Sequence, residues 1–117
     1  MTSGLKNVVF PVRDLGQAKA VYGALLGVPP YVDQAHYVGF RVGDQELGLD
    51  PNGHRQGLTG AVGYWEVADI AATIEAVIEA GATLQGEVRD VGGGLLIATV
   101  RDADGNVFGL RQSPPIR

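Results

Sequence analysis

Residues 8–15 have the sequence VVFPVRDL, and the same pattern returns 55 residues later as GYWEVADI at residues 63–70. In both segments an apolar run precedes an aspartate, and another apolar residue follows it. β-Branched and aromatic residues favour strands, and an aspartate just before an apolar periodic segment is typical of a helix N-cap. Each segment therefore predicts a strand that leads directly into a helix.

The residues beyond each segment continue the same order of elements. The first helix is predicted from an apolar stripe at helical spacing, Leu15, Ala18, Tyr22, Leu25 and Leu26, and the second from Ile70, Ile74, Val77 and Ile78. Gly27 and Gly81 are predicted to end them. Three short strands are expected after each helix, near 31–33, 37–42 and 46–49, and near 85–91, 95–100 and 107–111. Each repeat is thus a βαβββ module.

Two such modules in tandem predict an α+β fold. Module one is expected at about residues 5–50, module two at about 61–112, and a turn-rich connector at about 51–60, within a single domain of residues 1–117. A helix covers one face of each sheet and leaves the other face open. Two open faces side by side would form a concave mixed-sheet cleft for a small molecule.

Composition narrows the function classes. The net charge is −4 and only nine Lys and Arg residues are present, whereas a nucleic-acid binder needs a basic face. No apolar run reaches the length of about 18 residues that a membrane span needs, and we do not expect the first residues to form a signal peptide. Cysteine is absent, which is compatible with a reducing compartment. We therefore expect a cytoplasmic protein with a small-molecule partner, and neither a membrane nor a nucleic acid.

Three segments carry a resemblance to a known family. Val12-Arg13-Asp14-Leu15, Val67-Ala68-Asp69-Ile70 and the turn segment DADGNVFGL at residues 102–110 resemble the vicinal oxygen chelate superfamily, also called the glyoxalase/bleomycin-resistance/dioxygenase fold. In the last segment, Ala103 stands where the family usually has proline. The resemblance extends from about Leu5 to Gln112 and implies the βαβββ fold and a homodimer.

The resemblance also implies where a metal would be held. Metal-dependent members of the family place one ligand on the first and last strand of each module, and these positions fall on Asn7, Gly48, Val62 and Gly109. Glycine and valine have no donor atom, and asparagine is a weak neutral donor, whereas such sites use imidazole or carboxylate ligands. We therefore expect the metal-free branch of the family, with no cofactor.

Strand alternation gives a list of residues that face the predicted cleft. Tyr64 is expected as a stacking surface, the two glycines are expected to widen the cleft, and Phe10 and Trp65 are assigned to the core. The facing of the strand at 37–42 is not fixed by its sequence. The predicted ligand-binding residues are Asn7, Val9, Tyr37, Phe40, Glu46, Gly48, Val62, Tyr64, Glu66, Gly109 and Arg111.

The leading functional hypothesis is a binding protein of the bleomycin-resistance type, which sequesters a flat aromatic or glycosylated natural product as antibiotic-resistance proteins do. No catalytic residue is assigned, and His36 and His54 are interpreted as solvated loop residues. One alternative is a metal-dependent glyoxalase-like lyase, isomerase or dioxygenase, with ligands drawn from Glu46, Asp50, Glu66 and His36. Another is a metal-free enzyme in which Glu66 acts as a general base.

Overall fold

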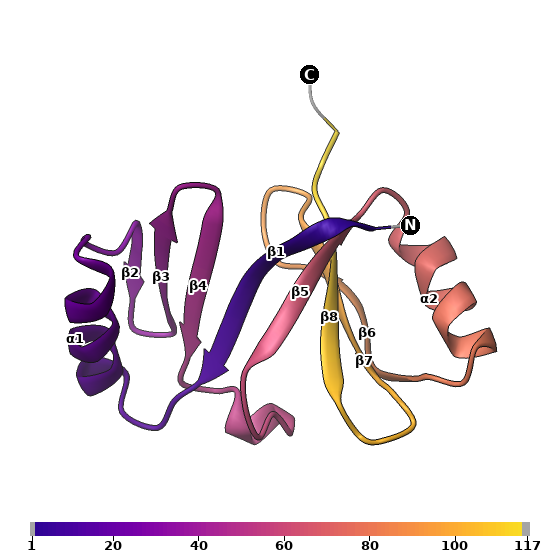
Figure 1. Ribbon diagram of the computed structural model, residues 1–117, viewed down its shortest axis with the longest axis horizontal. Helices are drawn as coiled ribbons and strands as arrows, with labels where there is room; N and C mark the ends of the chain where they lie inside the picture. Colours follow the sequence, from indigo (N-terminus) through magenta and orange to yellow (C-terminus); the bar gives the residue numbers. More distant parts are fainter. Residues whose placement is uncertain (1, 116–117) are drawn as a thin grey trace. The chain divides into compact units, whose positions relative to one another are not determined.

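The computed structural model describes residues 2–115 and contains two helices and eight strands. The first half comprises β1 (Thr2–Pro11), α1 (Leu15–Leu26), β2 (Val32–Gln34), β3 (Tyr37–Val42) and β4 (Gln45–Asp50). A 3-10 turn, η1 (His54–Gln56), follows. The second half comprises β5 (Val62–Val67), α2 (Ile70–Glu79), β6 (Thr83–Asp90), β7 (Leu96–Arg101) and β8 (Val107–Gln112). The predicted α+β fold with two βαβββ repeats is confirmed (Figure 1).

The chain forms two compact units. Within the described residues, the N-terminal unit contains residues 6–62, and the C-terminal unit contains residues 63–115 together with residues 2–5. The strand order is β2-β3-β4-β1 in the N-terminal unit and β5-β8-β7-β6 in the C-terminal unit. In each unit, the first and last strands of the repeat pair in parallel, and the other neighbouring strands pair antiparallel. The two repeats therefore share one topology.

Both helices begin and end as the sequence indicates. The side chain of Asp14 accepts a hydrogen bond from the backbone N–H of Gln17 at 3.0 Å, and Asp69 does the same for Ala72 at 3.0 Å. These contacts satisfy N–H groups that have no partner within the helix. α1 ends at Gly27, whose φ of 69° is left-handed and thus favours glycine.

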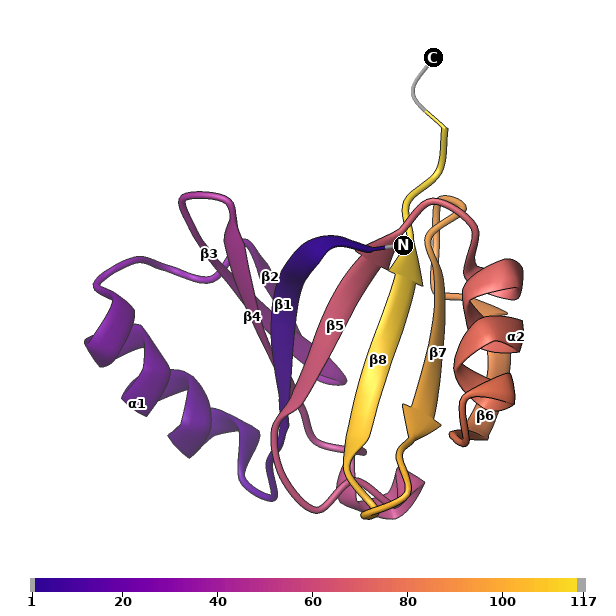
Figure 2. The ribbon, with the colours of Figure 1, turned by 45° about the vertical axis from the view of Figure 1, so that its right-hand side comes forward.

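Each helix packs on one face of its own sheet (Figure 2). In the C-terminal unit the buried cluster beneath α2 contains Val67, Ile70, Ile74, Ala98, Val100 and Leu110. In the N-terminal unit Val38, Phe40 and Leu49 are buried, and Tyr22 of α1 stacks on Phe10 with ring centroids 5.2 Å apart. We call this side the helix face of each sheet and the other side its open face.

Two residues of the predicted helix stripes and one residue assigned to the core are exposed. Leu25, in the apolar stripe predicted for α1, is 73% exposed, and Ile78, in the stripe predicted for α2, is also exposed. Trp65 lies on the helix-face side of β5 as predicted, yet 38% of it remains exposed. Leu25 and Leu26 are about 100° apart around the helix axis, and of the two only Leu26 packs on the core of the sheet, so Leu25 lies at the solvent edge of the stripe.

The turn at residues 102–106 joins β7 to β8. One carboxylate oxygen of Asp102 accepts hydrogen bonds from the backbone N–H groups of Asp104 and Asn106, and the other accepts one from the Asn106 side chain. These bonds, led by that of the Asn106 side chain, hold the pKa of Asp102 below its ordinary value. Gly105, with a φ of 88°, supplies the left-handed residue of the turn.

No helix in the described part of the chain is long and apolar enough to cross a membrane.

Candidate functional site

The open face of the N-terminal unit gathers most of the residues that were predicted for this half. Strands β1 and β4 pair so that Asn7 lies opposite Glu46 and Val9 lies opposite Gly48. On the neighbouring strand, Gly39 pairs with Gly48, and Tyr37 shares the side of Gly39 because side chains alternate along a strand. Of the six predicted residues in this unit's strands β1, β3 and β4, five are therefore on one face: Asn7, Val9, Tyr37, Glu46 and Gly48.

Phe40 is the exception. Its side chain lies on the helix face and is fully buried with Val38 and Leu49. The prediction that it contacts a ligand on the open face is corrected, since Phe40 pairs with Leu47 of the helix face. The sequence of β3 has apolar or aromatic residues on both faces, so its facing could not be settled until its register with β4 was known.

Two tyrosine rings lie over the glycines of this open face. A Cβ atom added to Gly48 would overlap the phenol oxygen of Tyr37. A Cβ added to Gly39 would lie 3.2 Å from Cε1 of Tyr31 and 3.3 Å from Cε2 of Tyr37. The expectation that Gly48 widens a cleft is therefore wrong, because the space beside it holds the Tyr37 side chain. The glycines instead let two aromatic rings approach the backbone of the sheet closely.

Charged groups adjoin this aromatic pair. The hydroxyl of Tyr31 donates a hydrogen bond of 2.8 Å to Oε1 of Glu46. The guanidinium carbon of Arg41 lies 4.1 Å from the centroid of the Tyr31 ring, and Nη2 of Arg41 is 3.7 Å from Oε2 of Glu46. Burial, then the hydrogen bond and negative charge of Glu46, raise the pKa of Tyr31, and Arg41 opposes this shift.

Arg41 was missed by the sequence reasoning, and Tyr31, although an aromatic residue that could line the cleft, was not among the predicted ligand-binding residues. Tyr31 precedes β2, a strand of only three residues, and is brought to the sheet by a backbone hydrogen bond from its N–H to the carbonyl of Gly39. Arg41 could have been found, because alternation along β3 places it on the same side as Tyr37 and Gly39.

The open face of the C-terminal unit repeats the arrangement of glycine and tyrosine. Tyr64 pairs with Gly109 across β5 and β8, and a Cβ on Gly109 would overlap the Tyr64 ring. Gly109 therefore does not open space for a ligand either. Tyr64 is only 8% exposed, so its ring is packed on the sheet and does not offer a free stacking surface. Val62, which begins β5 and is the last residue of the N-terminal unit, was also predicted to contact the ligand and is buried as well.

Glu66 is held by three hydrogen bonds and is not a solvated strand-end carboxylate. Nε of Arg111 donates to Oε1 at 3.0 Å, the hydroxyl of Ser113 donates to the same oxygen at 2.9 Å, and the backbone N–H of Ser113 donates to Oε2 at 3.0 Å. Ser113 was not singled out from the sequence. A general base needs a lone pair directed at the substrate proton, and here the carboxylate instead binds the chain that follows β8.

The residues at the four positions implied for a metal do not fit a metal ion. Gly48 and Gly109 bear no donor and are covered by tyrosines, Val62 bears no donor, and Asn7 is buried and engaged in other interactions. Within residues 2–115, no three His, Cys, Asp or Glu side chains lie together as a metal site would require. The ligand set drawn from Glu46, Asp50, Glu66 and His36 is thus not assembled.

The two histidines differ in their surroundings. His36 is exposed, in agreement with the interpretation of a solvated residue. His54, at the start of η1, is half-buried, and its Nδ1 atom is buried with no hydrogen-bond partner in the described part of the chain. The interpretation of His54 as a solvated residue is therefore wrong, because the connector turns inward at Gly53 and Leu58, both of which are buried.

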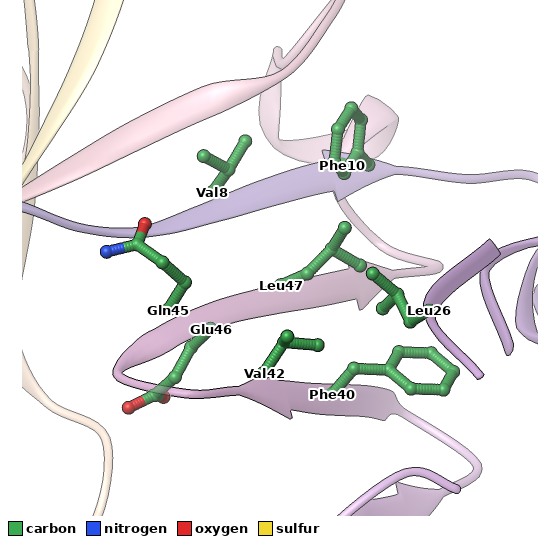
Figure 3. A pocket seen from close by; sticks show the side chains of 8 residues that line it. All are labelled: Val8, Phe10, Leu26, Phe40, Val42, Gln45, Glu46 and Leu47. Atoms are coloured by element: carbon green, nitrogen blue, oxygen red, sulfur yellow. The ribbon is translucent and has the colours of Figure 1, made fainter. Parts of the chain in front are cut away.

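A separate pocket of about 240 Å³ lies on the helix face of the N-terminal unit. Figure 3 shows its lining: Val8, Phe10, Leu26, Phe40, Val42, Gln45, Glu46 and Leu47. It exists because α1 ends at Leu26 and leaves the part of the sheet around Val42 uncovered. Glu46 points to the other side of β4 from Gln45 and Leu47 (Figure 3), so the pocket and the tyrosine pair occupy opposite faces of one sheet.

Comparison with known proteins gives a family match over most of the chain. Residues 4–110 match the family model of the Glyoxalase/Bleomycin resistance protein/Dioxygenase superfamily. Among curated proteins, none matches the sequence.

Solved structures resemble the fold at low sequence identity. A variant of methylmalonyl-CoA epimerase from Streptomyces coelicolor, in complex with 2-nitronate-propionyl-CoA, superposes with a TM-score of 0.76 at 15% identity, covering 100% of this chain and 99% of that one. The Mycobacterium tuberculosis methylmalonyl-CoA epimerase gives 0.68 at 20% identity, with 97% and 90% covered. A glyoxalase/bleomycin resistance protein/dioxygenase superfamily member from Vibrio splendidus gives 0.69 at 17%, with 91% and 96% covered. These likenesses concern the fold alone.

Proposed function

Since the chain belongs to the Glyoxalase/Bleomycin resistance protein/Dioxygenase superfamily, we propose that it binds a flat organic molecule on a tyrosine-lined sheet face, without a metal ion, and acts by sequestering that molecule. The observation that carries the proposal is the same in both units. At Gly48 and Gly109, where metal-dependent relatives are expected to hold a ligand, a tyrosine side chain of the same unit occupies the space.

The open face of the N-terminal unit is the better candidate for the binding surface. The rings of Tyr31 and Tyr37 lie over Gly39 and Gly48. Because Tyr37 is half-buried and Tyr31 is exposed, both rings remain accessible to solvent. Aromatic rings bind flat ligands by offset or edge-to-face packing, worth about 0.5–1.5 kcal/mol per pair beyond the burial of apolar area. Tyr64, which is packed on Gly109 and only 8% exposed, is less accessible to a ligand.

Sequestration requires affinity and no chemical step. The carboxylate that was the best candidate for a base, Glu66, is already bonded to Arg111 and Ser113. This arrangement supports a binding protein over a metal-free enzyme that depends on Glu66. The homodimer and the cytoplasmic location remain predictions, as does the identity of the ligand as an aromatic or glycosylated natural product.

A thermal-shift screen tests the proposal. The panel contains flat aromatic and glycosylated natural products and divalent metal ions, each measured with and without EDTA. A ligand at one hundred times its Kd adds about 2.7 kcal/mol to the free energy of unfolding, so binding is easily detected. We expect stabilisation by an organic compound that persists in EDTA. Stabilisation by a metal ion that EDTA reverses would favour the metal-dependent lyase, isomerase or dioxygenase instead.

Two variants of one residue then locate the site. Tyr37→Leu removes the aromatic ring and should abolish the shift caused by the compound, whereas Tyr37→Phe keeps the ring and should retain most of it. Circular dichroism of both variants shows that the fold is preserved. A compound whose shift is unchanged by Tyr37→Leu binds elsewhere, which would contradict the placement on this face.

A further inference from the structure

The side chain of Arg41 is more exposed than that of Arg111, the arginine on the open face of the C-terminal unit. Arg111 makes a hydrogen bond of 3.0 Å to Glu66, and its side chain is only 12% exposed. Arg41 is 3.7 Å from Glu46, which is longer than a direct hydrogen bond, and 53% of its side chain is exposed. The donors of Arg111 are turned to a carboxylate of the protein, whereas those of Arg41 can reach a molecule that arrives from solvent.

The guanidinium of Arg41 is also held in place. It lies 4.1 Å from the centroid of the Tyr31 ring, and the Tyr31 hydroxyl is fixed by its hydrogen bond to Glu46. A guanidinium over an aromatic ring is stabilised by the negative charge of the ring face. Because the guanidinium is planar and carries its donors in a fixed fork, an arginine held in this way is suited to a planar anion.

The charge around Glu46 favours a single negative charge on the ligand. Two cations, Arg41 and Lys6, lie 3.7 and 3.9 Å from the same oxygen of Glu46, so one carboxylate faces two positive groups in a chain whose net charge is −4. Asp44 is exposed in the turn between β3 and β4. Asp50 lies four residues further along β4, about 13 Å away at the rise of a strand.

Asp33, the remaining carboxylate of this sheet, is already neutralised by an ion pair with Lys19. Asp33 pairs with Val38 of the helix face, and its carboxylate is bonded to Lys19 at 2.6 Å. The aromatic rings of Tyr31 and Tyr37 and the available guanidinium of Arg41 are therefore next to one another on the open face, with no unpaired carboxylate of β2 between them.

We infer that the ligand of this face is an aromatic carboxylate, with its ring against Tyr37 and Tyr31 and its carboxylate on Arg41. The inference rests on the proposed function and goes further by naming the class of ligand. A monoanion balances the excess positive charge around Glu46, and the planar carboxylate matches the guanidinium fork.

Matched pairs of probes test the inference. Calorimetric titrations compare 1-naphthoate, 2-naphthoate and anthraquinone-2-carboxylate with the corresponding primary amides, which have the same rings and no charge. We expect each acid that binds to do so at least about tenfold more tightly than its amide, as charge-assisted hydrogen bonds imply. The preference should shrink when salt is raised from 0.05 to 0.5 M, because the site is partly exposed.

Three variants assign the preference to its residues. Arg41→Gln should erase the preference for acids and leave the affinity for amides nearly unchanged. Arg13→Gln, which removes the same charge from another exposed position of this unit, should change neither. Glu46→Gln keeps an acceptor for Tyr31 but removes the competing negative charge, so acids should bind several-fold more tightly.

The outcomes separate the inference from the proposed function. Equal binding of acids and amides, or a preference for acids that survives Arg41→Gln, overturns the inference and leaves the binding function standing. If neither set binds the wild-type protein, the proposal of a surface for flat aromatic molecules fails with it.

Discussion

The phenol of Tyr31 has a pKa that is set by burial and by two charged neighbours. Burial raises it, Glu46 raises it further by its hydrogen bond and its charge, and Arg41 lowers it. The folded-state pKa is thus above the unfolded value of about 10. The protonated phenol contributes stability that is fully present below that unfolded value and is lost as the pH rises through the folded pKa.

Two variants should move this pKa in opposite directions. Glu46→Gln removes the negative charge next to the hydroxyl, so the pKa of Tyr31 should fall. Arg41→Gln removes the opposing cation, so it should rise. NMR titration of protein labelled at the tyrosine Cζ atoms resolves the four tyrosines and measures both shifts. A titration midpoint of Tyr31 that is the same in all three proteins would contradict the contacts described around Glu46.

Glu66 is expected to stabilise the fold through the chain that follows β8. Glu66→Ala leaves Arg111 without its carboxylate partner and removes the bonds to Ser113, so the free energy of unfolding should fall by about 1–2 kcal/mol in urea. Ser113→Ala keeps the ion pair and should cost about 0.5 kcal/mol or less. If both variants unfold as the wild type does, these bonds do not persist in solution.

At the scale of elements, α1 shows what a pattern can and cannot predict. Its limits followed from Asp14 and Gly27, which act locally. Its inward face did not, because Gln17, Lys19 and the hydroxyl of Tyr22 are the only polar groups among the side chains of its twelve residues. An almost uniformly apolar helix has no polar side from which the buried side can be inferred. Packing against the sheet determines that Leu26 is covered and Leu25 is exposed.

Neighbouring leucines of α1 should therefore respond differently to truncation. Leu26→Ala removes a side chain that packs on the core of the N-terminal unit and should lower the free energy of unfolding by about 2 kcal/mol. Leu25→Ala removes one that is mostly in solvent and should change it by about 0.5 kcal/mol or less. Urea denaturation of the two variants measures the difference, and equal losses would mean that Leu25 is covered in solution.

For the molecule as a whole, the repeat predicted the order of elements, and strand alternation predicted which face each candidate residue occupies in β1, β4, β5 and β8. Two features lay beyond that reasoning. The tyrosines that cover Gly48 and Gly109 became evident only once side chains were packed, since alternation gives a side but not the space above it. The role of residues 2–5 depends on contacts with a segment about sixty residues away in sequence.

Those first residues should support the C-terminal unit and not the N-terminal one. The hydroxyl of Thr2 donates to the carbonyl of Glu66 at 2.7 Å, and Cδ1 of Leu5 would lie 2.9 Å from a Cβ on Gly63. Leu5 is 40% exposed, so Leu5→Ala should lower the free energy of unfolding by about 0.5–1 kcal/mol and speed amide hydrogen exchange in β5 and β8, with β3 and β4 unaffected. Val42→Ala, a half-exposed residue of the N-terminal unit, is the matched control, and its effect should appear in β3 and β4. Equal acceleration of exchange in all four strands for both variants would show that the chain opens only as a single cooperative body.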